Sequence, residues 1–303
     1  SKFSHLTTLA MDLKLDNELA VEYVKAVVRP AEVIHDFRQS AKNDKSNEHS
    51  PASAVFHDVL SDDSGKPKAF VIPNLLSAGE CDELIMAAEQ FGLDPPDKRA
   101  ATLRTAKRTS QYVNADLSEK VRARVQDIMT FKFRCSPNKD RKNDDGREIT
   151  EDDNMGPFRG IHNNWRILRY DIDSGDAFPA HQDQMDSLQE RHPDGTKDFV
   201  VSSHTLLINL SQDSLEGGAT RFYPRGKVRG TTLGQYDYAV DVMLPRGWAL
   251  VFPQRGLLHA GQPLFKTSPC SKYVAQAGVL RLLPQGCLCK PSVFRLGPGL
   301  IGF

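Results

Sequence analysis

A histidine and an aspartate two residues apart, His181 and Asp183, are the side chains whose spacing most clearly permits chemistry. On an extended strand successive side chains alternate between the two faces, so residues i and i+2 point the same way. One metal ion could therefore bind both. Because an H-x-D pair can arise by chance in a chain with nine histidines, a third ligand from elsewhere is needed to support the prediction.

The best candidate for the third ligand is His259, which follows a strongly apolar, strand-like run at residues 248–252. Two neutral imidazoles and one carboxylate occupy one face of an octahedral ion and leave the opposite face open, as is typical of non-haem Fe(II) oxygenases. Asp186 is close enough to His181 to compete as a ligand, but the strand spacing favours Asp183.

The motifs that accompany these residues resemble those of the prolyl-4-hydroxylase-like branch of the Fe(II)/2-oxoglutarate dioxygenases. That branch reads R-Y, G, F, H-x-D, G-G-x-T-x-F, P-x-G-x-A-L-x-F, H-x-G-x-P-V and K-Y. The corresponding blocks here, in the same order, are Arg169-Tyr170, Gly175, Phe178, residues 181–183, 217–222, 245–252 and 259–264, and Lys272-Tyr273. The resemblance covers residues 69–283.

The resemblance implies Fe(II) and O2 as cofactors and 2-oxoglutarate as a cosubstrate that is converted to succinate and CO2, with ascorbate as a candidate reductant. The distal carboxylate of 2-oxoglutarate must be paired, because an uncompensated buried charge is costly. Lys272 is the candidate for this role, with Tyr170 and Thr205 as further candidates for hydrogen bonds. The alternative for Lys272 is that it is an ordinary surface lysine on an edge strand, and the alternative for Tyr170 is that it is an aromatic residue of the core. The segment from His259 to Lys272 is longer than is usual in the family.

Substrate contacts are predicted by position on strands that should face the interior or its rim. Several arginines near a small pocket would suit a carboxylate-bearing substrate. The candidates are Arg166, Gln184, Arg221 and Arg281. Because side chains alternate between faces, about half of such candidates are expected to point outward.

Three functions remain open at this stage. The first is oxidation of an unactivated C–H bond in a small molecule, by hydroxylation, desaturation or oxidative cyclisation. The second is a peptidyl prolyl 4-hydroxylase that acts on a protein or peptide. The third, from a different class, is a non-catalytic metal-binding barrel. The sequence shows no separate peptide-binding module, which favours the small molecule.

Composition narrows the class of protein. The 303 residues are 39% apolar and their formal net charge is zero, so no global charge favours nucleic acid or a membrane surface. The longest apolar runs are shorter than the ~20 residues of a membrane helix. Five cysteines favour reduced thiols over a disulfide framework. The first residues lack the pattern of a secretory signal, and we expect a cytoplasmic protein.

The predicted fold is α+β and mainly β: a double-stranded β-helix, or jelly-roll, cupin-like barrel, braced by amino-terminal helices. Helices are expected at residues 17–28, near 33–37, from a capping box at Ser77 and Glu80 to Phe91, and from Ser118 onward. Strands are expected at residues 165–170, 199–210, 219–223, 238–244, 248–252 and 272–283.

The chain is divided into three regions by these patterns. Residues 1–68 are expected to form a helical amino-terminal extension and linker, residues 69–283 the dioxygenase domain, and residues 284–303 an irregular tail. Residues 138–154 are charged and lack periodicity, so we expect an exposed insertion. The sequence does not predict the oligomeric state.

Overall fold

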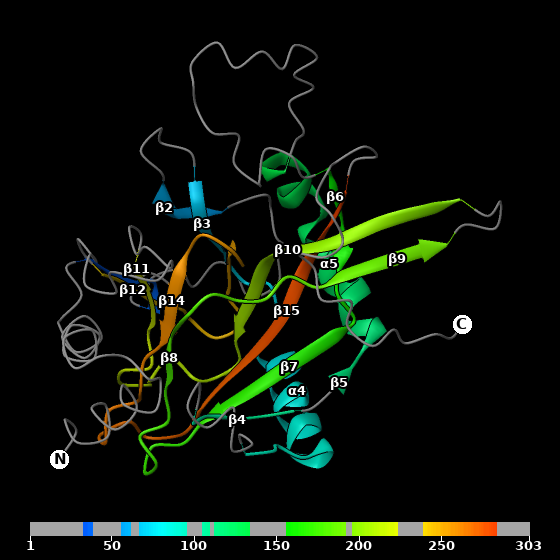
Figure 1. Cartoon of the computed structure of the whole chain (residues 1–303). Coiled ribbons are helices and arrows are strands. Elements are labelled where there is room, and N and C mark those ends of the chain that lie inside the picture. Colours follow the sequence, from blue (N-terminus) through cyan, green and yellow to red (C-terminus); the bar gives the residue numbers. More distant parts are fainter. Residues whose placement is uncertain are drawn as a thin grey trace, which may run out of the picture.

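The structure is a computed structural model that describes residues 33–38, 56–61, 67–95, 105–109, 112–133, 156–191, 196–223 and 239–283. Two β-sheets and two helices make up this part of the chain (Figure 1). The expected helix at 17–28, the insertion at 138–154 and the tail at 284–303 lie outside the described residues. Among the described helices, none is both long and apolar enough to span a membrane.

The larger sheet has ten strands and carries the long strands β10 and β15 at its centre. Its path runs β2-β3-β13-β10-β15-β7-β4, while β5 pairs with β7, β6 with β15 and β9 with β10. The strands are β2 (His57–Ser61), β3 (Pro67–Ile72), β4 (Lys107–Arg108), β5 (Tyr112–Val113), β6 (Phe158–Ile161), β7 (Asn164–Tyr170), β9 (Ser187–Arg191), β10 (Lys197–Asn209), β13 (Ala249–Pro253) and β15 (Lys272–Leu282).

The smaller sheet has five strands in the order β1-β12-β11-β14-β8. All its pairs are antiparallel except β1 with β12. Its strands are β1 (Val33–Asp36), β8 (Phe178–His181), β11 (Thr220–Tyr223), β12 (Val240–Met243) and β14 (Leu258–Gly261).

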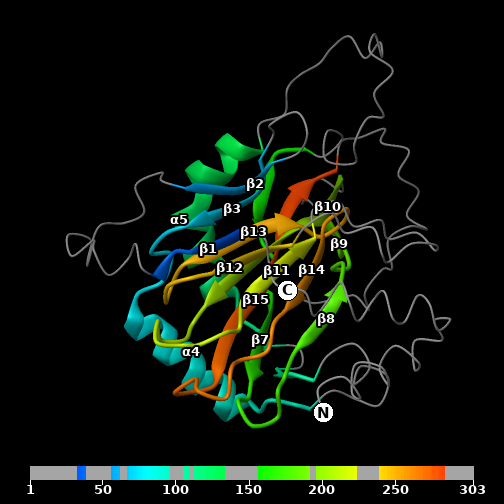
Figure 2. The same ribbon diagram turned by 90° about the vertical axis from the view of Figure 1, so that its left-hand side faces the viewer.

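The two sheets pack face to face, and the helices cover the other face of the larger sheet (Figure 2). Phe222 and Val240 of the smaller sheet share an apolar cluster with Leu250 and Phe252 of the larger one. A second cluster joins α4 (Ala78–Phe91) and α5 (Ala115–Lys132) to the opposite face of β10 and β15. The mainly-β fold with few helices is thus confirmed. The two sheets do not close into a barrel among the described strands, so the complete jelly roll stays a prediction.

The helices begin where side chains satisfy free backbone N–H groups. Ser77 and Glu80 form the expected capping box: the Ser77 hydroxyl accepts from Glu80 N, and the Glu80 carboxylate accepts from Ser77 N at 2.9 Å. The second helix begins earlier than expected, at Ala115, with Asn114 as its N-cap. Ser118 lies inside that helix and accepts a hydrogen bond from Trp165 Nε1 instead.

The prediction of a helix near residues 33–37 is wrong. Residues 33–36 form β1, which pairs in parallel with β12, and Ile34 is 61% exposed rather than buried. A short segment with two β-branched residues has weak helical preference, and a neighbouring strand with free hydrogen-bonding groups decides its conformation. β1 and β2 belong to the two sheets, and the division of the chain into three regions stays a prediction.

Candidate metal centre and adjoining pocket

The three predicted metal ligands meet between the two sheets. His181 ends β8 and pairs with His259 on β14, while Asp183 follows β8 by two residues. Asp183 Oδ1 lies 3.5 Å from His181 Nε2, and Asp183 Oδ2 lies 3.7 Å from His259 Nε2. The ligand atoms all lie within 4.8 Å of one another, which suits a single metal ion. The strand expected to carry both His181 and Asp183 ends at His181, but the triad is brought together as predicted.

Both imidazoles present the same nitrogen to the centre. His181 Nδ1 lies 2.7 Å from the carbonyl oxygen of Pro179, and His259 Nδ1 lies 3.3 Å from that of Leu257. Since a carbonyl can only accept a hydrogen bond, each Nδ1 carries the proton and each Nε2 keeps its lone pair. The backbone therefore sets both rings in the tautomer that a metal requires.

The carboxylate of Asp183 is oriented by two further side chains. Thr205 Oγ1 and Gln276 Nε2 both donate to Asp183 Oδ2, the latter at 3.0 Å. Thr205 was a candidate for the cosubstrate carboxylate, but its hydroxyl binds the metal-ligand candidate instead. Gln276 was not predicted, and the signal that could have identified it is its place four residues after Lys272 on the same face of β15.

Burial and charge hold the triad in the protonation states that bind cations. Burial by itself would raise the pKa of the Asp183 carboxyl, but hydrogen bonds and charge from the two histidines lower it well below its usual value. Burial lowers the pKa of His259 to about 4, against the opposing charge of Asp183. At neutral pH the site therefore offers one carboxylate and a neutral His259 imidazole.

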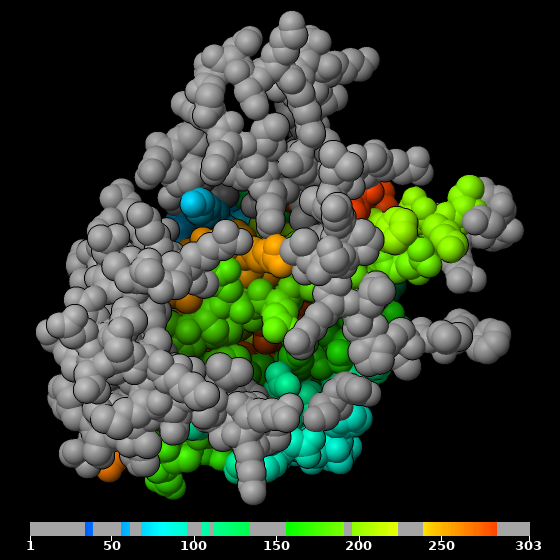
Figure 3. All heavy atoms as spheres, viewed as in Figure 1, coloured from blue at the N-terminus to red at the C-terminus, as the bar shows by residue number. Residues whose placement is uncertain are grey.

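Aromatic rings enclose the triad. Phe178 stacks on His181 with ring centroids 3.8 Å apart, and Phe252 lies edge-on to His259 at 4.6 Å. Green and orange atoms of the described strands are visible on this face of the molecule (Figure 3). Such apolar walls restrict water and strengthen electrostatic interactions at the centre.

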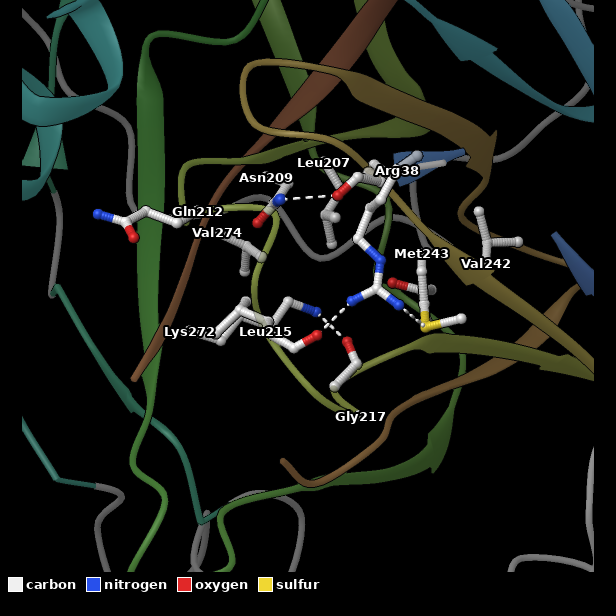
Figure 4. Close-up of a pocket in the computed structure, with 13 residues that line it drawn as sticks. Arg38, Leu207, Asn209, Gln212, Leu215, Gly217, Val242, Met243, Lys272 and Val274 are labelled. Atoms are coloured by element: carbon white, nitrogen blue, oxygen red, sulfur yellow. Dashed lines mark hydrogen bonds between the residues drawn. The ribbon is translucent and has the colours of Figure 1, made fainter. Parts of the chain in front are cut away.

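A pocket between the sheets contains Lys272 (Figure 4). The lysine is 9% exposed, and its ammonium donates to the carbonyl oxygen of Gly218. No carboxylate of the described residues lies within ion-pair distance of it. Burial, and then the charge of the nearby Arg38 guanidinium, lower the pKa of Lys272 to about 8. The described part of the pocket therefore presents a buried cation with no carboxylate beside it.

Tyr170 adjoins Lys272 as expected from the strand pairing. The two residues are direct partners across β7 and β15, and the ammonium lies 5.5 Å from the centre of the Tyr170 ring. The phenol oxygen reaches β14, where a Cβ placed on Gly261 would lie 2.7 Å from it. Tyr170 thus connects the pocket with the strand that carries His259.

The four substrate candidates divide between the two faces. Arg166 pairs with Gln276 across β7 and β15, so it lies on the side of the triad. Arg221 instead forms a two-point ion pair with Asp241, and the Nε–Oδ1 distance is 2.7 Å. It alternates with Phe222, which faces His259, and therefore points to the outer face of the smaller sheet.

Arg281 is also directed away from the centre, and Gln184 lies in the loop directly after Asp183. Arg281 donates to the carbonyl oxygen of Gly156 at 2.8 Å and covers the ring of Phe133 at the end of α5, on the helical side. Gln184 is exposed. Of the four, Arg166 alone shares the face of the metal-ligand candidates.

The chain is similar to several solved structures. No protein-family model matches the chain, and no curated protein sequence matches it. A viral collagen prolyl hydroxylase from Paramecium bursaria Chlorella virus-1, in complex with 2-oxoglutarate, is 20% identical with a TM-score of 0.41 and covers 71% of this chain and 96% of that one.

Two further solved structures are similar at the same level. A prolyl-4-hydroxylase from Pseudomonas putida is 14% identical with a TM-score of 0.38, over 72% of this chain and 94% of that one. The non-haem 2-oxoglutarate-dependent epimerase SnoN from nogalamycin biosynthesis is 15% identical with a TM-score of 0.45, over 78% and 88%. At these values the function has to be argued from the residues of the site.

Proposed function

We propose that this protein is an Fe(II)- and 2-oxoglutarate-dependent oxygenase. The observation that carries the proposal is the combination of a two-histidine, one-carboxylate centre with a buried lysine in the adjoining pocket that has no carboxylate partner among the described residues. A metal-binding barrel without catalysis would need only the first of these. The lysine adds a binding position for an anion and thereby favours the enzyme.

The donor set fits Fe(II). Two imidazole Nε2 atoms and one carboxylate converge, with both Nδ1 atoms tied to backbone carbonyls. His181, Asp183 and His259 would hold one face of an octahedral ion and leave the opposite positions to exogenous ligands. When bound, iron together with 2-oxoglutarate and O2 supplies the oxidising chemistry, and the protein supplies binding and orientation.

The pocket fits the distal carboxylate of 2-oxoglutarate. Lys272 and Gln276 lie on the same face of β15, four residues or roughly 13 Å apart along the strand. Gln276 contacts Asp183 at one end of this span, and Lys272 stands at the other. A five-carbon dicarboxylate that chelates the metal, together with the length of a lysine side chain, can bridge the distance. Lys272 would bind its carboxylate and Tyr170 would flank it.

The position of Arg166 favours the hypothesis that the substrate is a small, carboxylate-bearing molecule. Its side chain is half-buried on the face of Gln276, and its charge is felt by His162, whose pKa is lowered mainly by burial. No hydrogen bond or ion pair joins Arg166 to another of the described residues. A guanidinium in such a position suits bidentate binding of a carboxylate. The outcome would be hydroxylation, desaturation or oxidative cyclisation, according to which C–H bond is presented.

A peptidyl prolyl 4-hydroxylase is the second candidate, and the order of the sequence motifs favours it. In that case the metal centre would act on a proline of a bound peptide. The two candidates share the metal centre and the cosubstrate pocket, so they differ only in what stimulates turnover.

Succinate formation tests the proposal. The protein would be incubated with Fe(II), 2-oxoglutarate, O2 and ascorbate, alone and with panels of amino-acid derivatives, other carboxylate metabolites and proline-rich peptides. We expect the wild type to form succinate and the variants His181→Ala and Asp183→Asn to form none. The control Asp186→Asn, which lies outside the triad, should form succinate as the wild type does. Absence of succinate under every condition, with Fe(II) bound, would overturn the proposal in favour of a binding protein.

A further inference from the structure

A second cation enters the Lys272 pocket from a strand that the sequence motifs do not include. Arg38 lies two residues after the end of β1, and its guanidinium lines the pocket together with the lysine (Figure 4). The resemblance described above begins only at residue 69, so this arginine belongs to an addition to the motif-bearing part of the chain. β1 carries it into the site by pairing with β12.

The position of Arg38 is fixed by contacts on both sides of it. Phe37 N donates to the carbonyl oxygen of Met243 at 3.1 Å, and the Phe37 ring packs 6.0 Å from that of Trp248. The guanidinium binds Asp36 at two points, with Nε–Oδ1 at 2.8 Å and Nη2–Oδ2 at 2.7 Å. Its Nη1 donates to the carbonyl oxygen of Leu215. Its planar group is therefore held in one orientation before any ligand binds.

The two cations of the pocket differ in how their charges are compensated. Asp36 neutralises much of the Arg38 charge and keeps the guanidinium ionised, whereas the Lys272 ammonium has only the neutral Gly218 carbonyl as a hydrogen-bond acceptor among the described residues. Two cations that face one another across an apolar pocket repel each other, and a bound carboxylate would remove that repulsion. Val274 and Leu207 provide the apolar wall.

We propose that Arg38 is a second binding residue for the distal carboxylate of 2-oxoglutarate, which it would share with Lys272. The inference rests on the proposed function and extends it: the cosubstrate site is completed by β1. Binding of 2-oxoglutarate and docking of β1 then stabilise each other, because each provides the other with a partner.

Binding without turnover tests the role of Arg38. Affinity for 2-oxoglutarate would be measured by calorimetry on the full chain loaded with Mn(II) in the absence of O2. We expect Arg38→Met to raise the Kd by ~10-fold, as for the loss of one charged hydrogen bond. Lys272→Met should raise it by ~100-fold, as for the loss of a buried ion pair. Arg38→Lys should recover part of the loss. Arg122→Met, which removes an exposed arginine on α5, is the matched control and should leave the Kd unchanged.

An analogue separates a local effect from a general loss of structure. 2-Oxovalerate keeps the keto-acid group that chelates the metal but lacks the distal carboxylate, so its weaker binding should be the same in wild type and Arg38→Met. Hydrogen exchange at residues 34–38 should slow when 2-oxoglutarate binds and stay unchanged with 2-oxovalerate.

The outcomes distinguish this inference from the proposed function. Wild-type affinity in Arg38→Met together with lost affinity in Lys272→Met would overturn the role of Arg38 and leave the oxygenase intact. If the Mn(II)-loaded wild type does not bind 2-oxoglutarate at all, the proposed function itself fails.

Discussion

The side-chain amide of Gln276 donates a hydrogen bond to Asp183 Oδ2 over 3.0 Å, and this contact joins the central strand β15 to the metal centre. Thr205 donates to the same oxygen from β10. With two donors on Oδ2, the other carboxylate oxygen, Oδ1, is turned toward His181 Nε2. The two central strands of the larger sheet therefore set which oxygen is offered to a metal ion.

Replacement of Gln276 should loosen the metal without removing a ligand. In Gln276→Leu the amide donor is lost at nearly constant volume, and we expect ~10-fold weaker Fe(II) affinity, in the range found for groups that orient metal ligands. Anaerobic Fe(II) titration measures the change. Gln126→Leu, on the exposed side of α5, is the control. Unchanged Fe(II) affinity in Gln276→Leu would mean that Thr205 alone orients the carboxylate.

Gly218 should be required for 2-oxoglutarate binding because a side chain at this position would contact Lys272. Its φ is +69°, and a Cβ there would lie 3.1 Å from Lys272 Cδ and 3.0 Å from Leu264 Cδ2. We expect Gly218→Ala to displace the lysine and raise the Kd for 2-oxoglutarate by ~10-fold, while Fe(II) binding is unchanged. Calorimetry with the Mn(II)-loaded protein provides the measurement.

Gly175 offers a matched control for that substitution. Its φ is +63°, but no atom lies within 4 Å of the position of an added Cβ. Gly175→Ala therefore introduces the same kind of backbone strain, about 1 kcal/mol, without the contact. If both alanine variants weaken 2-oxoglutarate binding equally, strain and not displacement of Lys272 is the cause.

The candidate metal ligands could be predicted from sequence because the types and spacing of these residues themselves indicate metal binding. His181, Asp183 and His259 were identified in this way, and the structure brings them together. The Ser77 and Glu80 capping box was predictable for a similar reason, since it depends on neighbours three residues apart.

Residues that act through distant contacts were not predictable. Arg38 reaches the pocket only because β1 pairs with β12, about two hundred residues later in the chain, and a four-residue strand has no periodicity to reveal it. The hydrogen bond from Thr205 to Asp183 was not predicted either, because it depends on the loop position of Asp183, while the role of Thr205 toward the cosubstrate stays a prediction. Arg221 was placed on the correct strand but on the wrong face, which strand alternation alone does not decide.

The contact between Glu80 and α5 should contribute to stability in a pH-dependent way. Arg124 binds both Glu80 oxygens at 2.8 Å. These hydrogen bonds, opposed by burial and supported by the N–H of Ser77, lower the pKa of Glu80 from 4.5 to about 2. Because the folded-state pKa is depressed, the stabilisation is present above pH 4.5 and is lost as pH falls toward 2.

Glu80→Gln tests this relationship. At pH 7 we expect the free energy of unfolding to fall by about 1–2 kcal/mol in urea titrations, after allowance for solvent screening. The difference from wild type should vanish near pH 2. Glu83→Gln, at an exposed position of the same helix, should change the free energy by less than about 0.5 kcal/mol at both pH values. A pH-independent difference in Glu80→Gln would assign the effect to the amide itself.

Affinity for 2-oxoglutarate should fall above pH 8. Burial, and then the charge of Arg38, lower the pKa of Lys272 to about 8, so the ammonium that would bind the carboxylate is lost as pH rises through that value. We expect the Kd to be constant below pH 7 and to rise by up to ~10-fold per pH unit above pH 8. Binding near pH 8 should also take up protons, which appears as a dependence of the calorimetric heat on the buffer.

The variant Lys272→Arg tests whether the lysine, and not another titratable group around the pocket, causes the pH dependence. A guanidinium stays charged throughout this range, so the variant should bind 2-oxoglutarate with a pH-independent Kd between pH 7 and 9. Tyr170, which packs against the lysine, is retained in the variant. If the variant loses affinity above pH 8 as wild type does, a group other than Lys272 titrates and the lysine is not the ionising partner of the carboxylate.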